Sequence, residues 1–248
     1  MNPGKQIRWN HIFRKDGKAV IVAMDHSMRG VAPGLEDYVG TVKKVAEGGA
    51  DAVLVSYGNL LAYAKDLPRN LGYIVSIPYP PRVEFVKEAA KAGADGLKYT
   101  HFGGLRDPNL QMVQPIAAAC EEHGIVFMPE VVPQDEKRNT LYDQVADAAR
   151  LGQEAGGDFI KTAYTGSVES FKKAVKTCPI PIVILGGAKM ESDRDLLEVV
   201  KGAIDAGGAG TCMGRNVFQH KDPKAITAAM VKIVHEGASV DEAYKLIS

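Results

Sequence analysis

Short apolar runs alternate with stretches of helical periodicity along nearly the whole chain. The run AVIVAM at residues 19–24 is followed by the amphipathic segment EDYVGTVKKVAEGG at 36–49, and this order of strand and then helix recurs. Eight runs have the length and composition of buried parallel strands: residues 19–24, 51–57, 71–77, 95–100, 124–131, 158–163, 179–185 and 210–214. The pattern therefore predicts eight successive βα units.

A glycine-rich repeat marks every second predicted strand. GGAD ends at Asp51, AGAD at Asp95 and AGGD at Asp158, and the related AGGAG ends at Gly210. A glycine in these strings can end the preceding helix in a left-handed cap before the chain enters the next strand. Each step of the repeat spans enough chain for two βα units, which supports the count of eight strands.

The fold class follows from this count and from the positions of the glycine pairs. An open doubly wound sheet also alternates strands and helices, but it usually has a glycine-rich phosphate turn after its first strand. Here the glycine pairs follow the last two strands. We therefore predict an α/β fold, a (β/α)8 TIM barrel in a single domain over residues 1–248, with residues 1–18 covering the barrel floor.

Composition narrows the possible functions. The 248 residues are 46% hydrophobic and 24% charged, and 30 basic residues balance 30 acidic ones, so nucleic acid is not an expected partner. No apolar run approaches the roughly 18 residues of a spanning helix, and the first residues lack the apolar core of a signal peptide. We expect no membrane partner and a cytoplasmic location. Three widely spaced cysteines indicate buried free thiols rather than disulfides.

In a barrel the active site lies where the strands end, and few polar residues occupy those positions. Asp25 and His26 end the first predicted strand, Lys98 lies in the fourth, Glu130 in the fifth and Lys161 in the sixth. Lys98 and Lys161 each follow a repeated aspartate by three residues, so they hold equivalent places. An outward lysine would be buried against helices, so both are expected to point into the barrel mouth. For either lysine alone, snorkelling or a structural ion pair is the alternative.

Two lysines beside carboxylates can catalyse chemistry on a carbonyl compound. A free lysine has a pKa of about 10.4, which desolvation and a nearby cation can lower to roughly 7 to 8. Lys98 can supply that cation for Lys161. We therefore expect Lys161 to form an imine that accepts electrons while a carbon–carbon bond breaks or forms. Glu130 or Asp25 would move the proton of the β-hydroxyl.

Two glycine-containing loops indicate a phosphate site. Gly186 and Gly187 end the seventh predicted strand, while Gly214 and Arg215 end the eighth. Barrels bind phosphate at these loops, because glycine lets the backbone N–H groups approach the anion and arginine adds a charged contact. Glycines can also simply turn the chain, but two pairs in this order favour a phosphorylated small-molecule substrate.

Other interpretations stay open. A metal-dependent lyase or sugar-phosphate isomerase would need no imine, and His26 and His101 could meet Asp25 across the mouth, although no H-x-x-H or H-E-x-x-H pair is present. The same imine could serve a transaldolase-like or thiolase-like acyl-transfer reaction. A non-catalytic binder of phosphorylated metabolites is a further class. We expect neither a metal nor a cofactor.

Four strings carry a resemblance: AMDHS, DFIKTAYTG, CPIPIVILGGAK and MGRNVFQ. Together they resemble the archaeal-type class I fructose-bisphosphate aldolase family, of the DeoC/LacD type, which includes the aminodideoxyheptulosonate synthases and the thiolase of autoinducer-2 phosphate breakdown. The resemblance implies a lysine imine at Lys161, an acid/base role for Asp25, and a phosphate held by Gly186, Gly187, Gly214 and Arg215. It also implies a homo-oligomer, a pentamer or decamer.

The first loop departs from the family pattern. Members often read DHG where this chain has Asp25, His26 and Ser27. We therefore expect His26 and Ser27 to contact a different sugar end.

The fifth predicted strand departs as well. The aldolases and heptulosonate synthases carry a tyrosine proton donor at its end, where this chain reads MPEVVP. Counting back from Lys161 puts Glu130 in that place, whereas counting forward from Gly124 puts Val132 there. A glutamate here and a lysine in the fourth strand are closer to the tagatose-bisphosphate and sulfofructose-phosphate aldolases. Glu130 and Lys98 are therefore the expected acid/base partners.

Overall fold

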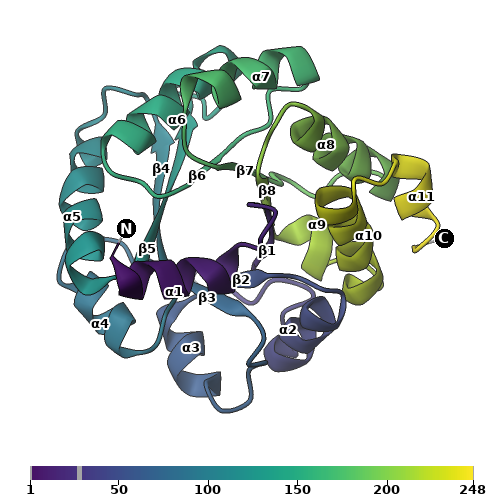
Figure 1. The fold of residues 1–248 in the computed structure, drawn as a ribbon, viewed down its shortest axis with the longest axis horizontal. Coiled ribbons are helices and arrows are strands. Elements are labelled where there is room, and N and C mark those ends of the chain that lie inside the picture. Colours follow the sequence, from purple (N-terminus) through teal and green to yellow (C-terminus); the bar gives the residue numbers. More distant parts are fainter. Residues whose placement is uncertain (1, 27–29, 248) are drawn as a thin grey trace.

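The computed structural model describes residues 2–26 and 30–247, in which eight parallel strands close into a barrel in the order β1 to β8. Helices surround this barrel (Figure 1). The strands are β1 Ala19–Ala23, β2 Ala52–Val55, β3 Gly72–Ser76, β4 Gly96–Gly103, β5 Val126–Pro133, β6 Ile160–Thr162, β7 Ile182–Leu185 and β8 Gly210–Met213. Each predicted run contains one strand or most of it, and the predicted (β/α)8 barrel is confirmed.

One helix precedes the first strand, and the other helices follow the strands around the outside. They are α1 Pro3–Ile12, α2 Tyr38–Glu47, α3 Tyr57–Tyr63, α4 Phe85–Lys91, α5 Val113–His123, α6 Val145–Glu154, α7 Val168–Thr177, α8 Asp193–Asp205, α9 Arg215–Phe218, α10 Pro223–Glu236 and α11 Val240–Tyr244, with 3-10 turns η1 Pro108–Met112 and η2 Tyr142–Gln144. Among the residues that the structure describes, no helix has the length and apolar character needed to cross a membrane.

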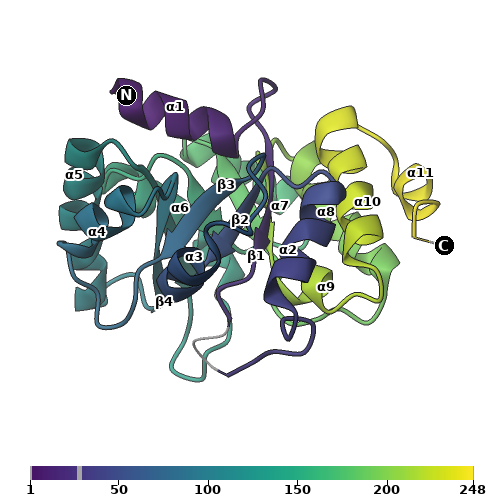
Figure 2. The same cartoon turned by 90° about the horizontal axis from the view of Figure 1, so that it is seen from below.

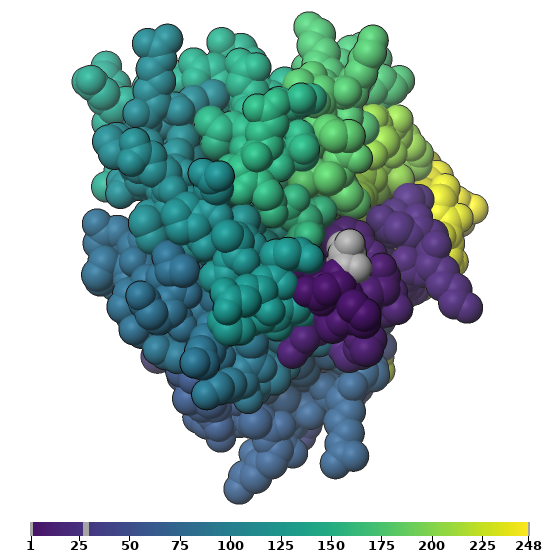
Figure 3. Space-filling view, turned by 60° about the vertical axis from the view of Figure 1, so that its left-hand side comes forward, coloured from purple at the N-terminus to yellow at the C-terminus, as the bar shows by residue number. Residues whose placement is uncertain are grey.

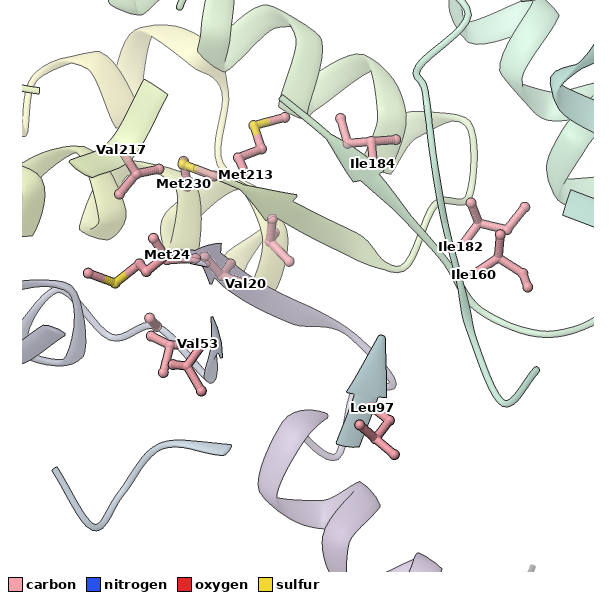
Figure 4. Packing of buried hydrophobic residues seen from close by; sticks show 14 of the residues in the cluster. Val20, Met24, Val53, Leu97, Ile160, Ile182, Ile184, Met213, Val217 and Met230 are labelled. Carbon is pink, nitrogen blue, oxygen red and sulfur yellow. The ribbon is translucent and has the colours of Figure 1, made fainter. Parts of the chain in front are cut away.

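Strand side chains alternate between two apolar layers. Val20, Val53 and Leu97 point outward and pack under the helices (Figure 4). Ile21 and Leu54, one position along from two of these residues, belong instead to the layer inside the barrel. Because successive side chains of a strand face opposite ways, this alternation decides which polar residues enter the barrel.

Helix α1 lies across the end of the barrel where the strands begin (Figure 2). The Asn2 side chain accepts a hydrogen bond from the first turn of α1, and proline occupies the first helical position, so the start of the helix is well defined. Ile12 belongs to the inner layer. Trp9 stacks on Phe13 with ring centroids 4.2 Å apart, and Phe13 meets Phe159 edge-on at 5.0 Å. These rings close the barrel floor.

Polar contacts attach α1 to the chain beside it. Figure 3 shows the purple N-terminal segment against the teal part of the chain. Lys5 Nζ lies 2.6 Å from Glu121 Oε2 and 3.0 Å from Asp158 Oδ2. Arg8 donates to the carbonyl of Gly124 at 2.9 Å. The lysine is buried, so α1 is fixed by charge as well as by packing.

The repeated aspartates have a role that the sequence pattern did not reveal. Asp51, Asp95 and Asp158 each accept a hydrogen bond from a backbone N–H of the preceding strand, at 2.7 or 2.8 Å. Each also pairs with a basic side chain: Asp51 with Arg14 and His235, Asp95 with His11, and Asp158 with Lys5. The repeat therefore ties neighbouring strands to the floor of the barrel.

Candidate active site

Four buried or nearly buried charged side chains meet inside the barrel at the carboxyl ends of its strands. Lys161 Nζ on β6 lies 2.7 Å from Glu130 Oε1 on β5. Lys98 Nζ on β4 lies 3.2 Å from Glu130 Oε2 and 2.7 Å from Asp25 Oδ2, just after β1. The structure thus brings together all four residues that the sequence assigns to catalysis.

Strand register explains the position of Glu130. Glu130 and Lys161 are partners in the pairing of β5 with β6, and Glu130 and Thr100 are partners in the pairing of β4 with β5. Thr100 Oγ1 donates to Glu130 Oε2 at 2.9 Å. Val132, the other position that counting along the chain allowed, is buried and does not line the cavity described below. Glu130 is therefore the polar group of β5 in this site.

Asp25 is held on two sides. Besides its contact with Lys98, Asp25 Oδ2 accepts a hydrogen bond from Ser76 Oγ at 2.5 Å. Ser76 and Lys98 are partners in the pairing of β3 with β4, so both side chains face the same carboxylate. Ser76 and Thr100 escaped the sequence analysis. The sequence offered one signal for each of them. Thr100 lies two residues from Lys98, and Ser76 lies two residues from Ile74, so each shares the inward face of its strand.

The charges correct one expectation from the sequence. Burial does act to lower the pKa of Lys161, but Cys212, Glu130 and Asp25 outweigh burial and raise it. Burial raises the pKa of the Cys212 thiol to about 11, so near neutral pH the thiol is uncharged and the carboxylates stabilise the ammonium. Burial opposes the charge of Glu130 too, yet the two lysines lower its pKa to about 2. The predicted lowering of the Lys161 pKa by Lys98 was wrong, because the sequence could not show how closely Glu130 approaches the amine.

A cavity of about 540 Å³ opens at these four residues. Its lining includes Gly186 and Gly187 after β7, Gly214 and Arg215 after β8, and His26 after β1. The predicted catalytic group and the predicted phosphate loops therefore share one cavity. Ser27, which was also expected in the site, lies outside the described residues.

The glycines of the two loops are required by their surroundings. Gly187 has a φ of +62°, a conformation that favours glycine. A Cβ on Gly214 would lie 2.6 Å from His26 Cε1 and 2.7 Å from the carbonyl oxygen of Ala23. Arg215 Nη2 donates to the Gly187 carbonyl at 2.7 Å, so its guanidinium crosses from one loop to the other.

Asn216 joins the same loops and was missed by the sequence analysis. Its Nδ2 donates to the carbonyls of Gly186 and Ala188, each at 3.1 Å, and its Oδ1 accepts from the backbone N–H of Met190 at 2.7 Å. One buried amide therefore fixes the loop after β7 against the start of α9. Its sequence signal was weak, because an asparagine two residues after a glycine looks like an ordinary turn residue.

The two histidines weighed as metal ligands lie apart. His26 Nδ1 is 3.8 Å from Asp25 Oδ1, and burial lowers the pKa of His26. His101 Nε2 contacts the carbonyl of Gly104 at 3.2 Å, and His101 does not line the cavity. Within residues 2–26 and 30–247, no group of three or more His, Cys, Asp or Glu side chains is arranged to hold a metal ion.

The fold and this site define a (β/α)8 barrel enzyme with a buried lysine–carboxylate centre beside two glycine loops. Residues 19–220 match the DeoC/LacD family of aldolases, and the chain belongs to this family. The family predicted from the four sequence strings is confirmed.

Several curated relatives match over nearly their whole length. The 2-amino-3,7-dideoxy-D-threo-hept-6-ulosonate synthase of Halobacterium salinarum is 34% identical, with 97% of this chain and 95% of the relative covered. A class 1 fructose-bisphosphate aldolase of Halobacterium salinarum is 32% identical, with 92% and 95% covered. An uncharacterized aldolase of Saccharolobus solfataricus is 30% identical, with 98% and 99% covered.

Solved structures agree with these matches. An archaeal fructose 1,6-bisphosphate aldolase has a TM-score of 0.80 at 25% identity, covering 94% of this chain and all of the other. A Schiff-base-forming fructose-1,6-bisphosphate aldolase has a TM-score of 0.79 at 25% identity, covering 93% and 100%. A third, archaeal, carries its catalytic lysine covalently bound to the carbinolamine intermediate, with the same score and identity over 93% and 99%. The protein is a class I aldolase, a carbon–carbon lyase.

Proposed function

We propose that this aldolase forms its imine through Lys161 and makes or cleaves a carbon–carbon bond in a phosphorylated ketose or related keto sugar. One observation carries the proposal: the Lys161 amine lies inside the cavity, 2.7 Å from Glu130, and the glycine loops after β7 and β8 line the same cavity. The solved relatives that form a Schiff base on lysine support this chemistry.

The first stage is formation of the imine. Glu130 Oε1 takes a proton from Lys161 Nζ, and the freed amine attacks the ketone carbon to give a carbinolamine. Glu130 returns the proton to the carbinolamine hydroxyl, which leaves as water. The resulting iminium has one positive charge at the nitrogen that carried the ammonium. The carboxylates that raise the pKa of Lys161 therefore also stabilise this intermediate.

The second stage breaks the carbon–carbon bond. Asp25 accepts the proton of the hydroxyl on the carbon β to the imine, and the electrons of the α–β bond move into the iminium to give an enamine and a free aldehyde. Protonation of the enamine and hydrolysis then release the other product and restore Lys161. Burial opposes the charge of Asp25, but Lys98 and Lys161 lower its pKa, so Asp25 is a carboxylate ready to accept a proton.

The substrate phosphate belongs at the loops after β7 and β8. Gly186, Gly187 and Gly214 let the anion approach the backbone, and Arg215 supplies a positive charge at their edge. His26 lines the same cavity and stays in the proposal as a substrate contact. A homo-oligomeric state and a cytoplasmic location stay predictions.

Borohydride trapping tests the proposal. The enzyme is incubated with a panel of phosphorylated ketones and sulfosugars, reduced with borohydride and digested. We expect loss of activity and the mass of the reduced substrate on the peptide that contains Lys161. An unmodified Lys161 in an enzyme that turns over the same substrate would contradict the proposal.

Replacing Asp25 by asparagine separates the two stages. Asn keeps the size of the side chain but accepts no proton, so we expect turnover to fall by about 10²- to 10⁴-fold. Trapping at Lys161 should persist, because Glu130 still serves the amine. Single-turnover cleavage and the yield of the borohydride adduct are measured in parallel. Loss of the adduct together with turnover in a folded D25N protein would instead assign Asp25 to imine formation.

A further inference from the structure

The two ends of the cavity differ in chemistry. In a closed barrel of eight strands, β3 and β4 lie across the mouth from β7 and β8 (Figure 1). The described lining on the β3 and β4 side includes Ser76, Lys98 and Thr100 at the charged centre, together with Tyr99. The rest of the wall on that side is built from Ile77, Pro78, Tyr79 and Pro81 of the loop after β3, and from Phe102 on β4. The glycine loops and a guanidinium face an apolar and aromatic wall.

Among the described residues, the positive charge that no carboxylate balances lies on one side of the cavity. Among the described residues that line it, Lys98, Lys161 and Arg215 carry positive charge, and the two lysines are balanced by Asp25 and Glu130. Arg215, after β8, therefore carries the positive charge that these two carboxylates do not balance. On the opposite wall, the cation among the described lining residues is Lys98, which is already paired with Asp25 and Glu130. A phosphate on that wall, with a charge of about −1.5 to −2, would find no further positive partner among these residues.

The opposite wall has uncovered aromatic surface instead. Tyr79 is 87% exposed and Phe102 is 46% exposed, although both line the cavity. Covering aromatic surface with an apolar part of a ligand removes it from water and is favourable. His26, which also lines the cavity, packs beside Gly214 on the phosphate side, and burial lowers its pKa.

We infer that the substrate carries a single phosphate, bound at the loops after β7 and β8, and that its far end is uncharged and partly apolar and packs against Tyr79 and Phe102. This inference rests on the proposed function, because it names the substrate class of the same site. Its physical basis is that a second phosphate at the far end would lose its hydration without gaining, among the described lining residues, a cation that is not already paired with a carboxylate.

Paired ligands of equal chain length test the inference. Binding of hexyl phosphate and of 1,6-hexanediol bisphosphate to the wild-type enzyme is measured by calorimetry at fixed ionic strength. We expect the monophosphate to bind about tenfold more tightly or better, because one phosphate of the bisphosphate has no partner. A bisphosphate that binds as tightly as the monophosphate, or more tightly, would overturn the inference, as would undetectable binding of the monophosphate.

Substitutions at the wall make the test specific. Phe102→Arg places a cation on a half-exposed strand position and should largely remove the preference, raising the relative affinity for the bisphosphate by about tenfold. Tyr142→Arg is the matched control, because Tyr142 is an exposed aromatic residue, at 55%, that does not line the cavity. The control should leave the preference unchanged. An equal change in both variants would show a general charge effect and overturn the inference.

Borohydride trapping keeps the two proposals apart. If Lys161 is trapped and the bisphosphate is preferred, the proposed function stands and the inference about the far end fails. If no ketone is trapped at Lys161 but the monophosphate preference and its loss in the F102R variant are found, the cavity ends are as inferred and the imine proposal fails.

Discussion

The two ends of this barrel use the same kinds of side chain for different purposes. At the floor, Asp51, Asp95 and Asp158 pair with basic groups and also accept backbone N–H groups of the strands. At the mouth, Asp25 and Glu130 have side-chain partners and border a cavity. A carboxylate bonded to the backbone holds the strands together, whereas a carboxylate bonded to ionisable side chains beside a cavity is placed to exchange protons.

The pKa directions follow the same division. Burial opposes the charge of both Asp158 at the floor and Glu130 at the mouth. It prevails at Asp158, where it raises the pKa. At Glu130 the two lysines prevail and lower the pKa to about 2. The two lysines at the mouth therefore keep Glu130 ionised despite its burial, and an ionised carboxylate can stabilise a cation on the neighbouring nitrogen.

The largest expected effect is at the mouth. Lys161→Met should reduce turnover by about 10⁴-fold or more, because it removes the imine-forming nucleophile. Steady-state rates with the best trapped substrate measure this loss. Circular dichroism on the same samples checks that the variant is folded. A K161M variant that keeps more than a few per cent of wild-type turnover would contradict the division between the two ends.

A smaller effect is expected at the floor. Lys5 is 2% exposed and pairs with Glu121 and Asp158, so Lys5→Met should lower the free energy of unfolding by about 3 kcal/mol. Urea unfolding measures this loss, and turnover of the folded protein should stay within about twofold. The control is Lys232→Met, which removes a surface pair with Glu236 and should cost less than about 1 kcal/mol. If K5M kept its full stability but lost turnover, Lys5 would serve catalysis and not the stability of the barrel floor.

The smallest effect is a pH dependence. The pKa of Glu130 is about 2 in the folded protein against 4.5 for the ordinary group, so its stabilising contribution is complete above 4.5 and declines as the pH falls toward 2. Glu130→Gln should therefore be less stable than wild type at pH 7, and the gap should narrow by about 1 kcal/mol at pH 4.

Urea unfolding at the two pH values measures this gap. Glu154→Gln, which removes an exposed partner of Arg150, is the control and should have little effect at either pH. A gap between wild type and E130Q that widens in acid would show that Glu130 is not the stabilised carboxylate described here.

Much of the fold could be predicted from the sequence. Apolar runs separated by amphipathic segments gave all eight strands, because buried parallel strands need continuous hydrophobic residues. The spacing from the repeated aspartates also put Lys98 and Lys161 in equivalent places, and both face the cavity. The bond from each aspartate to the preceding strand was not predictable, because it depends on how the barrel closes.

The charged residues of the site could be predicted from the sequence, but their pKa directions and short contacts could not. Counting along the chain left Glu130 and Val132 as candidates for the polar position of the fifth strand, and the strand register pairs Glu130 with Lys161. The direction of the Lys161 pKa depends on a distance of 2.7 Å that no spacing along the chain reveals. Asn216, Ser76 and Thr100 act through short contacts across strands or loops, and as single polar residues they resemble many others.

The amide of Asn216 makes the loops proposed to bind phosphate a structural unit that is separate from the rest of the mouth. Since its contacts all run to the segment from Gly186 to Met190, the loop after β3 makes none of them. Exchange of residues 77–84 for another loop should therefore change which aldehyde the enzyme accepts, while the loops after β7 and β8 keep their structure. A barrel organised in this way can diversify its acceptors one loop at a time.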